Sequence, residues 1–190
     1  MPDTIELIAV AFNIGYVILA ARENIWCWPL GIIGSLLSIW LFVDARLYAE
    51  SVLFSYYVFM GFYGWYQWSG KRDENDTLLI KEWPWKNHLI ILVGGYLSTY
   101  GLFLVLRHFT DAEMPLLDSF TTVFSFIATW LTAKRFIENW IYWIAIDALT
   151  VYLYFSRDLN VYAVLSLVYT FMAVYGFYNW NKDLKQQRIQ

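Results

Sequence analysis

Long apolar runs alternate with short clusters of charged residues along the chain. The runs occupy residues 5–21, 26–43, 47–68, 88–106, 115–133, 137–155 and 159–180, so each is about 17 to 22 residues long. A helix that rises about 1.5 Å per residue needs about 20 residues to cross the roughly 30 Å of hydrocarbon in a bilayer. The pattern therefore predicts seven membrane-spanning helices joined by short connections, with no soluble catalytic domain between them.

The composition as a whole is that of a membrane protein. Hydrophobic residues make up 59% of the 190 residues, aromatic residues 21% and charged residues only 15%. A soluble domain has about a quarter charged residues, which it needs to face water. The net charge of -3 gives no reason to expect nucleic acid as a partner. We therefore expect an all-α integral membrane protein whose exterior contacts the lipid bilayer.

The chain offers few groups for metal or redox chemistry. Cys27 is the only cysteine, which excludes a disulfide framework, and the two histidines, His88 and His108, fall at opposite ends of one run. An enzyme would need a nucleophile with a base, or a set of metal ligands, within reach of one another. We expect no metal, no cofactor and no enzymatic activity.

The distribution of Lys and Arg between alternate connections predicts the orientation, because basic connections stay in the cytoplasm. Three basic residues fall on one side: Arg46, Arg107 and Arg157. Ten fall on the other side: Arg22, Lys71, Arg72, Lys81, Lys86, Lys134, Arg135, Lys182, Lys185 and Arg188. This asymmetry predicts an N-terminus outside and a C-terminus in the cytoplasm.

Two parts of the chain resemble each other in order and spacing. Glu23-Asn24-Ile25-Trp26-Cys27-Trp28 opens the second run and Glu138-Asn139-Trp140-Ile141-Tyr142-Trp143 opens the sixth, at an offset of 115. Gly64-Trp65-Tyr66-Gln67-Trp68 closes the third run and Gly176-Phe177-Tyr178-Asn179-Trp180 closes the seventh, at an offset of 112. Matches at both ends of a two-helix unit favour a true repeat over chance similarity between aromatic-rich helices.

This repeat predicts how the seven helices are organised. Three helices end on the side of the membrane opposite to their start, so two copies in the same orientation need one extra crossing between them. We predict a three plus one plus three arrangement of two parallel repeats: residues 1–70 form the first three-helix repeat, 71–110 a cytoplasmic loop and linker helix, and 111–190 the second repeat and a cytoplasmic tail. Parallel repeats of this kind hold a substrate site between them near the midplane, which is the plan of a transporter.

Asp147 is the acidic residue farthest from the ends of any run, and it is the strongest candidate for binding a substrate. An acid at the bilayer centre costs about 2.5 to 3.5 kcal/mol on insertion scales, so it normally faces a cavity and a partner. The alternatives are a protonated, structural Asp147 and one that couples transport to protons. Trp140 and Trp143 share its helix face, because the three lie at i, i+3 and i+7. Their flat rings can stack on a planar heterocycle and attract a cation, so the three suit a cationic aromatic ligand.

Further polar side chains could line the same path. The fifth run contains five polar residues at intervals of 4, 3, 4 and 3, which places them on one helix face as a polar stripe. They are Asp118, Thr122, Ser125, Thr129 and Thr132. Either a hydrophilic path or hydrogen bonding between helices explains such a stripe. The candidate substrate-binding residues are Trp140, Trp143, Asp147, Asn139, Thr122, Ser125, Tyr169 and Thr170.

Several motifs together resemble the PnuC family of bacterial vitamin transporters. They are Trp28-Pro29-Leu30-Gly31-Ile32-Ile33-Gly34, Leu47-Tyr48-Ala49-Glu50, Tyr63-Gly64-Trp65-Tyr66-Gln67-Trp68 and the pair Trp140 and Trp143. They occur in the family's order, and the resemblance covers nearly the whole chain. The family is similar in topology to full-length SWEET sugar transporters. The resemblance therefore implies a SWEET-like fold in the bacterial inner membrane and a role for the tryptophan pair in substrate binding.

The resemblance also implies a function, the passage of nicotinamide riboside by facilitated diffusion, with phosphorylation inside the cell trapping the substrate. One departure leaves the branch open, because Phe54 stands where many nicotinamide riboside members have a glutamine. The thiamine branch, PnuT, is the alternative, since thiamine is also a cation that Asp147 could meet. An alternative of another class is a membrane-embedded receptor or scaffold without transport. The sequence leaves open whether the chain is a monomer or a homo-oligomer.

Overall fold

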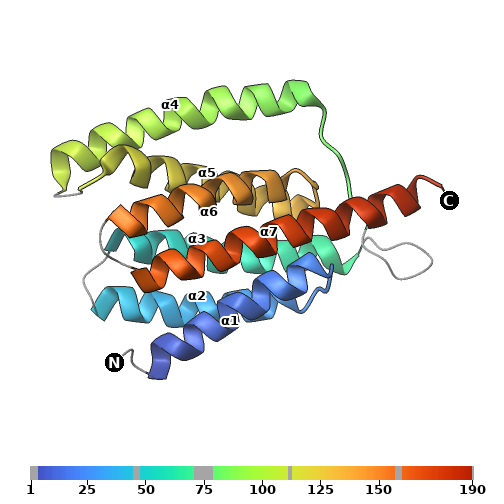
Figure 1. Cartoon of the computed structure of the whole chain (residues 1–190), viewed down its shortest axis with the longest axis horizontal. Helices are drawn as coiled ribbons and strands as arrows, with labels where there is room; N and C mark the ends of the chain where they lie inside the picture. The colour runs from blue at the N-terminus through green and yellow to red at the C-terminus, as the bar shows by residue number, and fades with distance from the viewer. Residues whose placement is uncertain (1–3, 45–47, 71–78, 111–112, 157–159, 190) are drawn as a thin grey trace.

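The chain folds into a bundle of long helices in the computed structural model (Figure 1). The structure describes residues 4–44, 48–70, 79–110, 113–156 and 160–189. In these ranges the helices are α1 (Thr4–Ala21), α2 (Cys27–Asp44), α3 (Tyr48–Ser69), α4 (Trp85–Phe109), α5 (Pro115–Lys134), α6 (Asn139–Ser156) and α7 (Asn160–Gln187). The seven predicted helices are confirmed, and six of the predicted runs agree with a helix to within three residues at both ends.

The end of α7 is the exception, because the helix continues seven residues beyond the predicted limit at Trp180, to Gln187. The apolar run ends at Trp180, but the segment before α4 gives the polar extension a surface to pack on. Leu184 is buried in the same apolar cluster as Ile80, and the backbone N–H of Ile80 donates to Oε1 of Gln187 at 3.2 Å.

Length and apolar composition alone qualify three helices in the described ranges as membrane spans, namely α1, α4 and α5, and α2 contains a shorter apolar stretch, Cys27–Leu41. The remaining helices carry more tyrosine, tryptophan and polar residues. Such residues are tolerated in a membrane when they face other helices rather than lipid.

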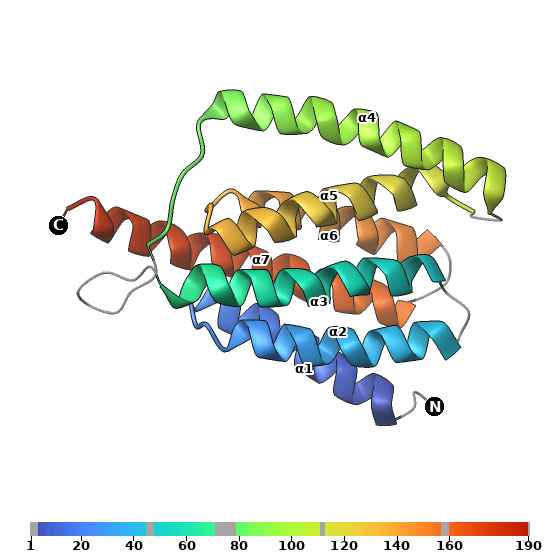
Figure 2. The ribbon, with the colours of Figure 1, turned by 180° about the vertical axis from the view of Figure 1, so that it is seen from behind.

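Six of the helices form a closed ring in the order α1, α2, α3, α5, α6, α7, so that α1 and α7, the first and last helices, also pack on each other. α4 lies outside this ring along α5 (Figures 1 and 2). Gly95 allows α4 to approach closely, because a Cβ atom there would lie 2.9 Å from the ring of Phe124. We call α1 to α3 the first half of the ring and α5 to α7 the second half.

The two halves have matching backbone geometry at positions 112 apart. α2 and α6 each contain 18 residues, and both their first and their last residues differ by 112. Glu23 and Arg135, also 112 apart, are the two non-glycine residues with positive φ among those described, at 56° and 66°. The backbone N–H of Asn24 donates to Leu19, and that of Phe136 donates to Leu131 in the matching turn.

The predicted offset of 115 at the start of the sixth run is wrong. The helices before and after the matched turns all correspond at the one offset of 112. Trp28 therefore corresponds to Trp140 rather than to Trp143. The environment of the two rings agrees: a Cβ atom added at Gly64 would overlap the Trp28 ring, and one added at Gly176 would lie 2.7 Å from the Trp140 ring.

Four buried tryptophans join the two halves at one end of the ring, and we call them the tryptophan array. Trp28 packs edge-on against Trp68 at 5.3 Å between ring centroids, Trp68 contacts Trp180 at 5.9 Å, and Trp180 packs edge-on against Trp140 at 5.6 Å. None of the four is more than 3% exposed. Aromatic pairs favour such edge-to-face contacts because the positive ring edge meets the negative ring face.

The middle pair of the array also makes hydrogen bonds that cross between the halves. Nε1 of Trp68 donates to the carbonyl of Thr132 at 3.3 Å, and Nε1 of Trp180 donates to the carbonyl of Ala20 at 3.0 Å. Both the donors and the acceptors are 112 residues apart, so the two bonds are equivalent. They tie α3 to α5 and α7 to α1.

The segment before α4 is attached to the second half. The backbone N–H of Lys81 donates to Arg135 at 2.9 Å, and the N–H of Ile137 donates to Lys81 at 2.9 Å. The ring of Trp83 stacks on Phe136 at 5.0 Å. α4 is therefore held at its start by the turn between α5 and α6.

The basic residues gather at the end of the ring that carries the tryptophan array. Of the nine basic residues that the structure describes, one, Arg107, lies at the opposite end of the bundle. The other eight belong to connections or helix ends on the array side: Arg22, Lys81, Lys86, Lys134, Arg135, Lys182, Lys185 and Arg188. Arg46, Lys71, Arg72 and Arg157, which also entered the predicted asymmetry, lie outside the described residues. We call this the basic end.

Substituting either matched glycine by alanine should destabilise the protein. In Gly176→Ala the added methyl group would meet the Trp140 ring, and in Gly64→Ala it would meet the Trp28 ring. Overpacking of this kind costs about 1 to 3 kcal/mol. The thermal unfolding midpoint in one detergent should fall in both variants. Gly94→Ala is the matched control, because no atom lies within 4 Å of a Cβ there; a Gly176→Ala variant that unfolds at the same temperature as Gly94→Ala would contradict the expected packing.

Candidate functional site

Asp147 occupies the middle of α6, eight residues after its first residue and nine before its last. Its side chain is half-buried. The side chains that interact with it electrostatically include the phenol groups of Tyr57 on α3 and Tyr169 on α7. An acidic group at this depth thus has phenol groups of both halves within its electrostatic range.

Tyr57 and Tyr169 are matched positions, because they differ by 112 residues. Tyr57 also forms a side-chain hydrogen bond with Ser125 on α5. Ser125 is 5% exposed. A carboxyl group, two phenols and a hydroxyl on α3, α5, α6 and α7 are therefore linked by electrostatic interactions and one hydrogen bond. We call Asp147, Tyr57, Tyr169 and Ser125 the central cluster.

Trp143 lies one turn before Asp147 on α6 and is half-buried. Its Nε1 donates to the hydroxyl of Thr132 at 3.4 Å, and that hydroxyl also lies 3.1 Å from Oδ1 of Asn139. These contacts hold the indole ring against the end of α5. The ring is thus fixed in orientation while part of its surface remains uncovered.

Trp140 and Asn139 are placed differently from Trp143. Trp140 is covered by Gly176 and Trp180 as a member of the tryptophan array. Asn139 is fully buried, and its Nδ2 donates to the carbonyl of Phe136 at 2.7 Å, which stabilises the turn that starts α6. Both residues are thus buried in the protein interior next to Trp143, where they stabilise the start of α6.

The remaining predicted residues lie on α5 and α7. Thr122 is half-buried and lies about one turn before Ser125 on α5. Thr170 follows Tyr169 and is also half-buried, and its hydroxyl donates to the carbonyl of Ser166 at 2.9 Å within α7. Of the eight predicted residues, Asp147 and Tyr169 thus interact electrostatically, Ser125 is linked to them through Tyr57, and Trp143 lies one turn from Asp147 on α6.

Tyr57 is the member of the central cluster that the sequence analysis missed. It lies in an aromatic-rich helix in which no single tyrosine stands out. The signal that would have found it is the repeat itself, because Tyr57 is the counterpart of the predicted Tyr169 at the offset of 112.

The chemistry of this cluster is suited to binding. Carboxyl, phenol and hydroxyl groups can accept and donate hydrogen bonds to a polar solute, and an indole face can stack on a ring. Among the described residues no group of three His, Cys, Asp or Glu side chains is arranged to hold a metal ion.

Fold and site together define the class of protein. An apolar helical bundle that encloses a carboxyl group midway along its length offers a polar solute a binding place inside the membrane. Two matched halves that meet around such a place are the plan of an alternating-access carrier. The chain is a helical membrane transporter.

The comparison with known proteins gives the family. The family model described as nicotinamide mononucleotide transporter matches residues 3–182. The chain belongs to the nicotinamide mononucleotide transporter family. The resemblance to PnuC transporters noted in the sequence is thereby confirmed.

Individual relatives agree with this assignment. The nicotinamide riboside transporter PnuC of Escherichia coli is 23% identical over 89% of this chain and 81% of its own length, and that of Neisseria mucosa is 25% identical over 100% and 76%. The riboflavin/roseoflavin transporter RibM of Streptomyces davaonensis is 20% identical over 85% and 77%. A crystal structure of the vitamin B3 transporter PnuC superposes with a TM-score of 0.77 at 25% identity, covering 94% of this chain and 81% of that one.

Proposed function

We propose that the protein carries nicotinamide riboside across the bacterial cytoplasmic membrane by facilitated diffusion, and that phosphorylation inside the cell traps the substrate. The observation that carries this proposal is the pairing of Asp147 with Trp143 at the centre of the bundle, in a chain whose relatives include nicotinamide riboside transporters. Nicotinamide riboside has a flat, positively charged pyridinium ring and a ribose with several hydroxyls. Each of these features has a counterpart among the clustered side chains.

The proposed binding mode follows from those counterparts. The indole of Trp143 stacks on the pyridinium, and Asp147 meets its positive charge. Tyr57, Tyr169 and Ser125 bond the ribose hydroxyls. The half-buried threonines Thr122 and Thr170 line the path on either side, whereas Trp140 and Asn139 support the site through packing and the turn before α6.

The proposed architecture is a three plus one plus three arrangement similar to that of SWEET transporters. The repeats comprise residues 1–70 and 111–190, with residues 71–110 as cytoplasmic loop and linker helix, and a pseudo-two-fold axis along the membrane normal relates them. The matched hydrogen bonds of Trp68 and Trp180 support this axis, as does the exchange of α1 with α5 and of α3 with α7 in the ring. Alternating access then consists of the two repeats rocking about the site.

A second candidate substrate is riboflavin, because one relative is a riboflavin/roseoflavin transporter. Riboflavin also has a flat ring and hydroxyls, but it is neutral and leaves the charge of Asp147 without a counterpart. Thiamine is a cation and satisfies the carboxylate. The effect of removing that charge therefore separates the neutral riboflavin from the two cations, nicotinamide riboside and thiamine.

Asp147→Asn and Trp143→Ala should weaken binding in different ways. The first variant removes a charge and keeps the shape, so the affinity for nicotinamide riboside should fall about tenfold, or 1.4 kcal/mol. The affinity for its neutral analogue with a reduced ring should change little. The second variant removes a stacking surface, so both ligands should lose affinity. Isothermal titration of both ligands against both variants measures these four changes.

Tyr152→Phe serves as the matched control for these titrations. Tyr152 lies on the same helix and is 60% exposed, so its hydroxyl should not matter for binding. If folded Asp147→Asn bound the cation and the neutral analogue with wild-type affinity, Asp147 would have a structural role and the proposed contact would be wrong.

Transport should be energy-independent. A single carboxyl group deep in the bundle provides few groups to couple transport to an ion gradient. The sequence also contains no ATP-binding motif. In proteoliposomes, labelled nicotinamide riboside should reach equal concentrations on both sides, and should accumulate only when a nicotinamide riboside kinase and ATP are enclosed. Accumulation driven by an imposed proton or sodium gradient, without the kinase, would refute facilitated diffusion and make Asp147 a coupling residue.

The basic end should face the cytoplasm, with the N-terminus outside, because eight of the nine described basic residues lie there. Lys185→Cys should react with a membrane-impermeant thiol reagent only from the inner side, and Arg107→Cys only from the outer side. Both positions are exposed, whereas the native Cys27 is fully buried and should give little background. The reverse labelling pattern in oriented vesicles would invert the orientation.

A further inference from the structure

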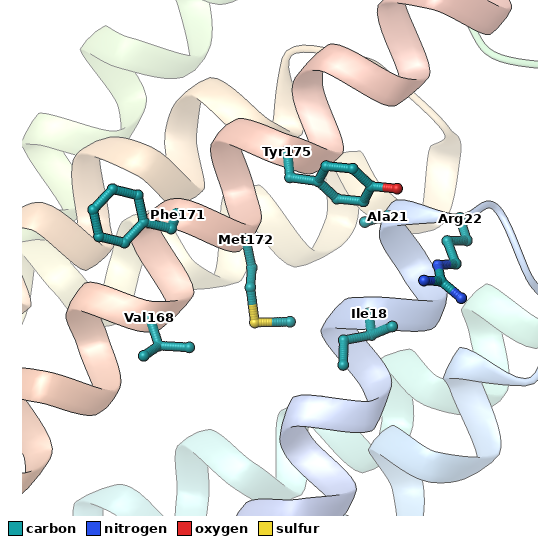
Figure 3. A pocket seen from close by; sticks show the side chains of 7 residues that line it. All are labelled: Ile18, Ala21, Arg22, Val168, Phe171, Met172 and Tyr175. Carbon is teal, nitrogen blue, oxygen red and sulfur yellow. The ribbon is translucent and has the colours of Figure 1, made fainter.

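A groove of about 450 Å³ lies between α1 and α7 (Figure 3). Its walls include Ile18 on α1, Arg22 directly after α1, and Val168, Phe171, Met172 and Tyr175 on α7. The apolar members are open to the surroundings: Ile18 is 39% exposed, Val168 41% and Phe171 67%. The groove therefore opens toward lipid rather than toward the central cluster.

The lining of this groove is polar at one end and apolar at the other. The guanidinium of Arg22 and the hydroxyl of Tyr175 lie at the end nearer the basic end, and Val168 and Phe171 lie at the other (Figure 3). Lys182, which is exposed, follows Tyr175 by two turns on α7 and adds a second positive charge beyond Arg22. The groove thus has the polarity of a phospholipid, with a cationic place for a phosphate next to an apolar trough.

α1 and α7 are held together on both sides of the groove. Toward the basic end, Nδ2 of Asn179 donates to the carbonyl of Ala21 at 2.9 Å, next to the bond between Trp180 and Ala20. Toward the opposite end, the hydroxyl of Tyr162 donates to Oε1 of Glu6 at 2.8 Å. We call the interface between α1 and α7 the α1–α7 seam. It is closed at its two ends by these hydrogen bonds, and the groove is the gap between them.

The matched seam between α3 and α5 is filled at the corresponding positions. Trp130 stands where Ile18 stands in the first seam, and its ring packs against Trp83 at 5.5 Å. Lys134 takes the place of Arg22, and its Nζ lies 5.1 Å from the ring of Tyr63, the counterpart of Tyr175. In this seam the protein itself supplies a bulky ring for the gap and a partner for the cation. In the α1–α7 seam the smaller Ile18 stands at the position of Trp130, and the groove remains open.

We propose that the α1–α7 groove binds an anionic phospholipid of the cytoplasmic leaflet. The phosphate contacts Arg22 and the Tyr175 hydroxyl, and an acyl chain lies along Ile18, Val168 and Phe171. The choice of an anionic over a neutral lipid rests on charge, because Arg22 and Lys182 both attract the extra negative charge. The choice of leaflet rests on the proposed orientation of the basic end, whereas the groove itself is independent of the transported substrate.

Native mass spectrometry of the full chain in detergent tests this site. The protein is supplied with an equal mixture of phosphatidylglycerol and phosphatidylcholine that carry the same acyl chains. The wild type should retain phosphatidylglycerol about fivefold better, the preference expected from one basic residue at the headgroup. Arg22→Ala should reduce the preference strongly, because Arg22 contacts the phosphate and Lys182 lies beyond it. Lys134→Ala, the matched change in the filled seam, should leave it intact.

A second variant tests the trough separately from the charge. Ile18→Trp copies the arrangement at Trp130 and should fill the groove, so that retention of both lipids falls. Val168→Trp is the substitute if Ile18→Trp does not fold, as judged by its elution profile and thermal midpoint. Both variants can be measured without any vitamin, so the result is separate from the proposed transport function.

Four outcomes would overturn the proposal. Equal retention of the two lipids by the wild type would remove the anionic headgroup from the site. Preserved preference in Arg22→Ala, or preserved retention in the folded tryptophan variant, would place the lipid elsewhere on the protein. A dimer mass that disappears in the tryptophan variant would assign the groove to a second copy of the chain.

Discussion

Two tryptophan rings pressed onto two glycines determine how closely the helices of this bundle can pack. Trp28 lies on Gly64 and Trp140 lies on Gly176, so α2 meets α3, and α6 meets α7, at the distance of an indole ring from a bare backbone. Trp68 and Trp180 then join the two halves through ring contact and a pair of crossing hydrogen bonds. Because these contacts set the positions of α3 and α7, they also place Tyr57 and Tyr169, one from each half, within electrostatic range of Asp147. The central cluster thus depends on packing at the basic end.

The framework is duplicated, whereas the chemistry of the centre is duplicated only in part. The counterpart of Trp143 is Gly31, that of Asp147 is Ser35, and that of Ser125 is Asn13. The residues that shape the ring, such as Trp28 and Trp140, retain their identity across the repeat, because each must fill the same space. Trp143 and Asp147, which would touch the flat ring and the charge of a solute, differ from their counterparts, because one solute molecule has a single flat ring and a single charge. Tyr57 and Tyr169, which would touch its hydroxyls, are the same residue in both halves. An asymmetric ligand therefore requires an asymmetric site within a symmetric framework.

The sequence predicted most of the helices and part of the candidate site, and the reasons for the difference are physical. Helix limits follow from the change between apolar and charged residues, and α7 escaped this rule because Leu184 packs on Ile80, far away in sequence. The repeat was visible, but the many tryptophans near each helix start allowed a register of 115 as well as 112, and only the hydrogen bonds of the turn distinguish them. The different burial of Trp140 and Trp143 could not be predicted, because both lie on the same face of α6. Which of the two rings is covered depends on where α7 packs.

The closed order of the ring has a consequence for how the protein is made. α1 leaves the ribosome first and packs on both α2 and α7, and its contact with Trp180 spans 160 residues of chain. Helices α2, α3, α5 and α6 can each find a neighbour soon after synthesis, whereas one side of α1 stays unpartnered until the last helix has entered the bilayer. Assembly in the membrane therefore ends with a ring-closing step that joins the oldest and the youngest helix.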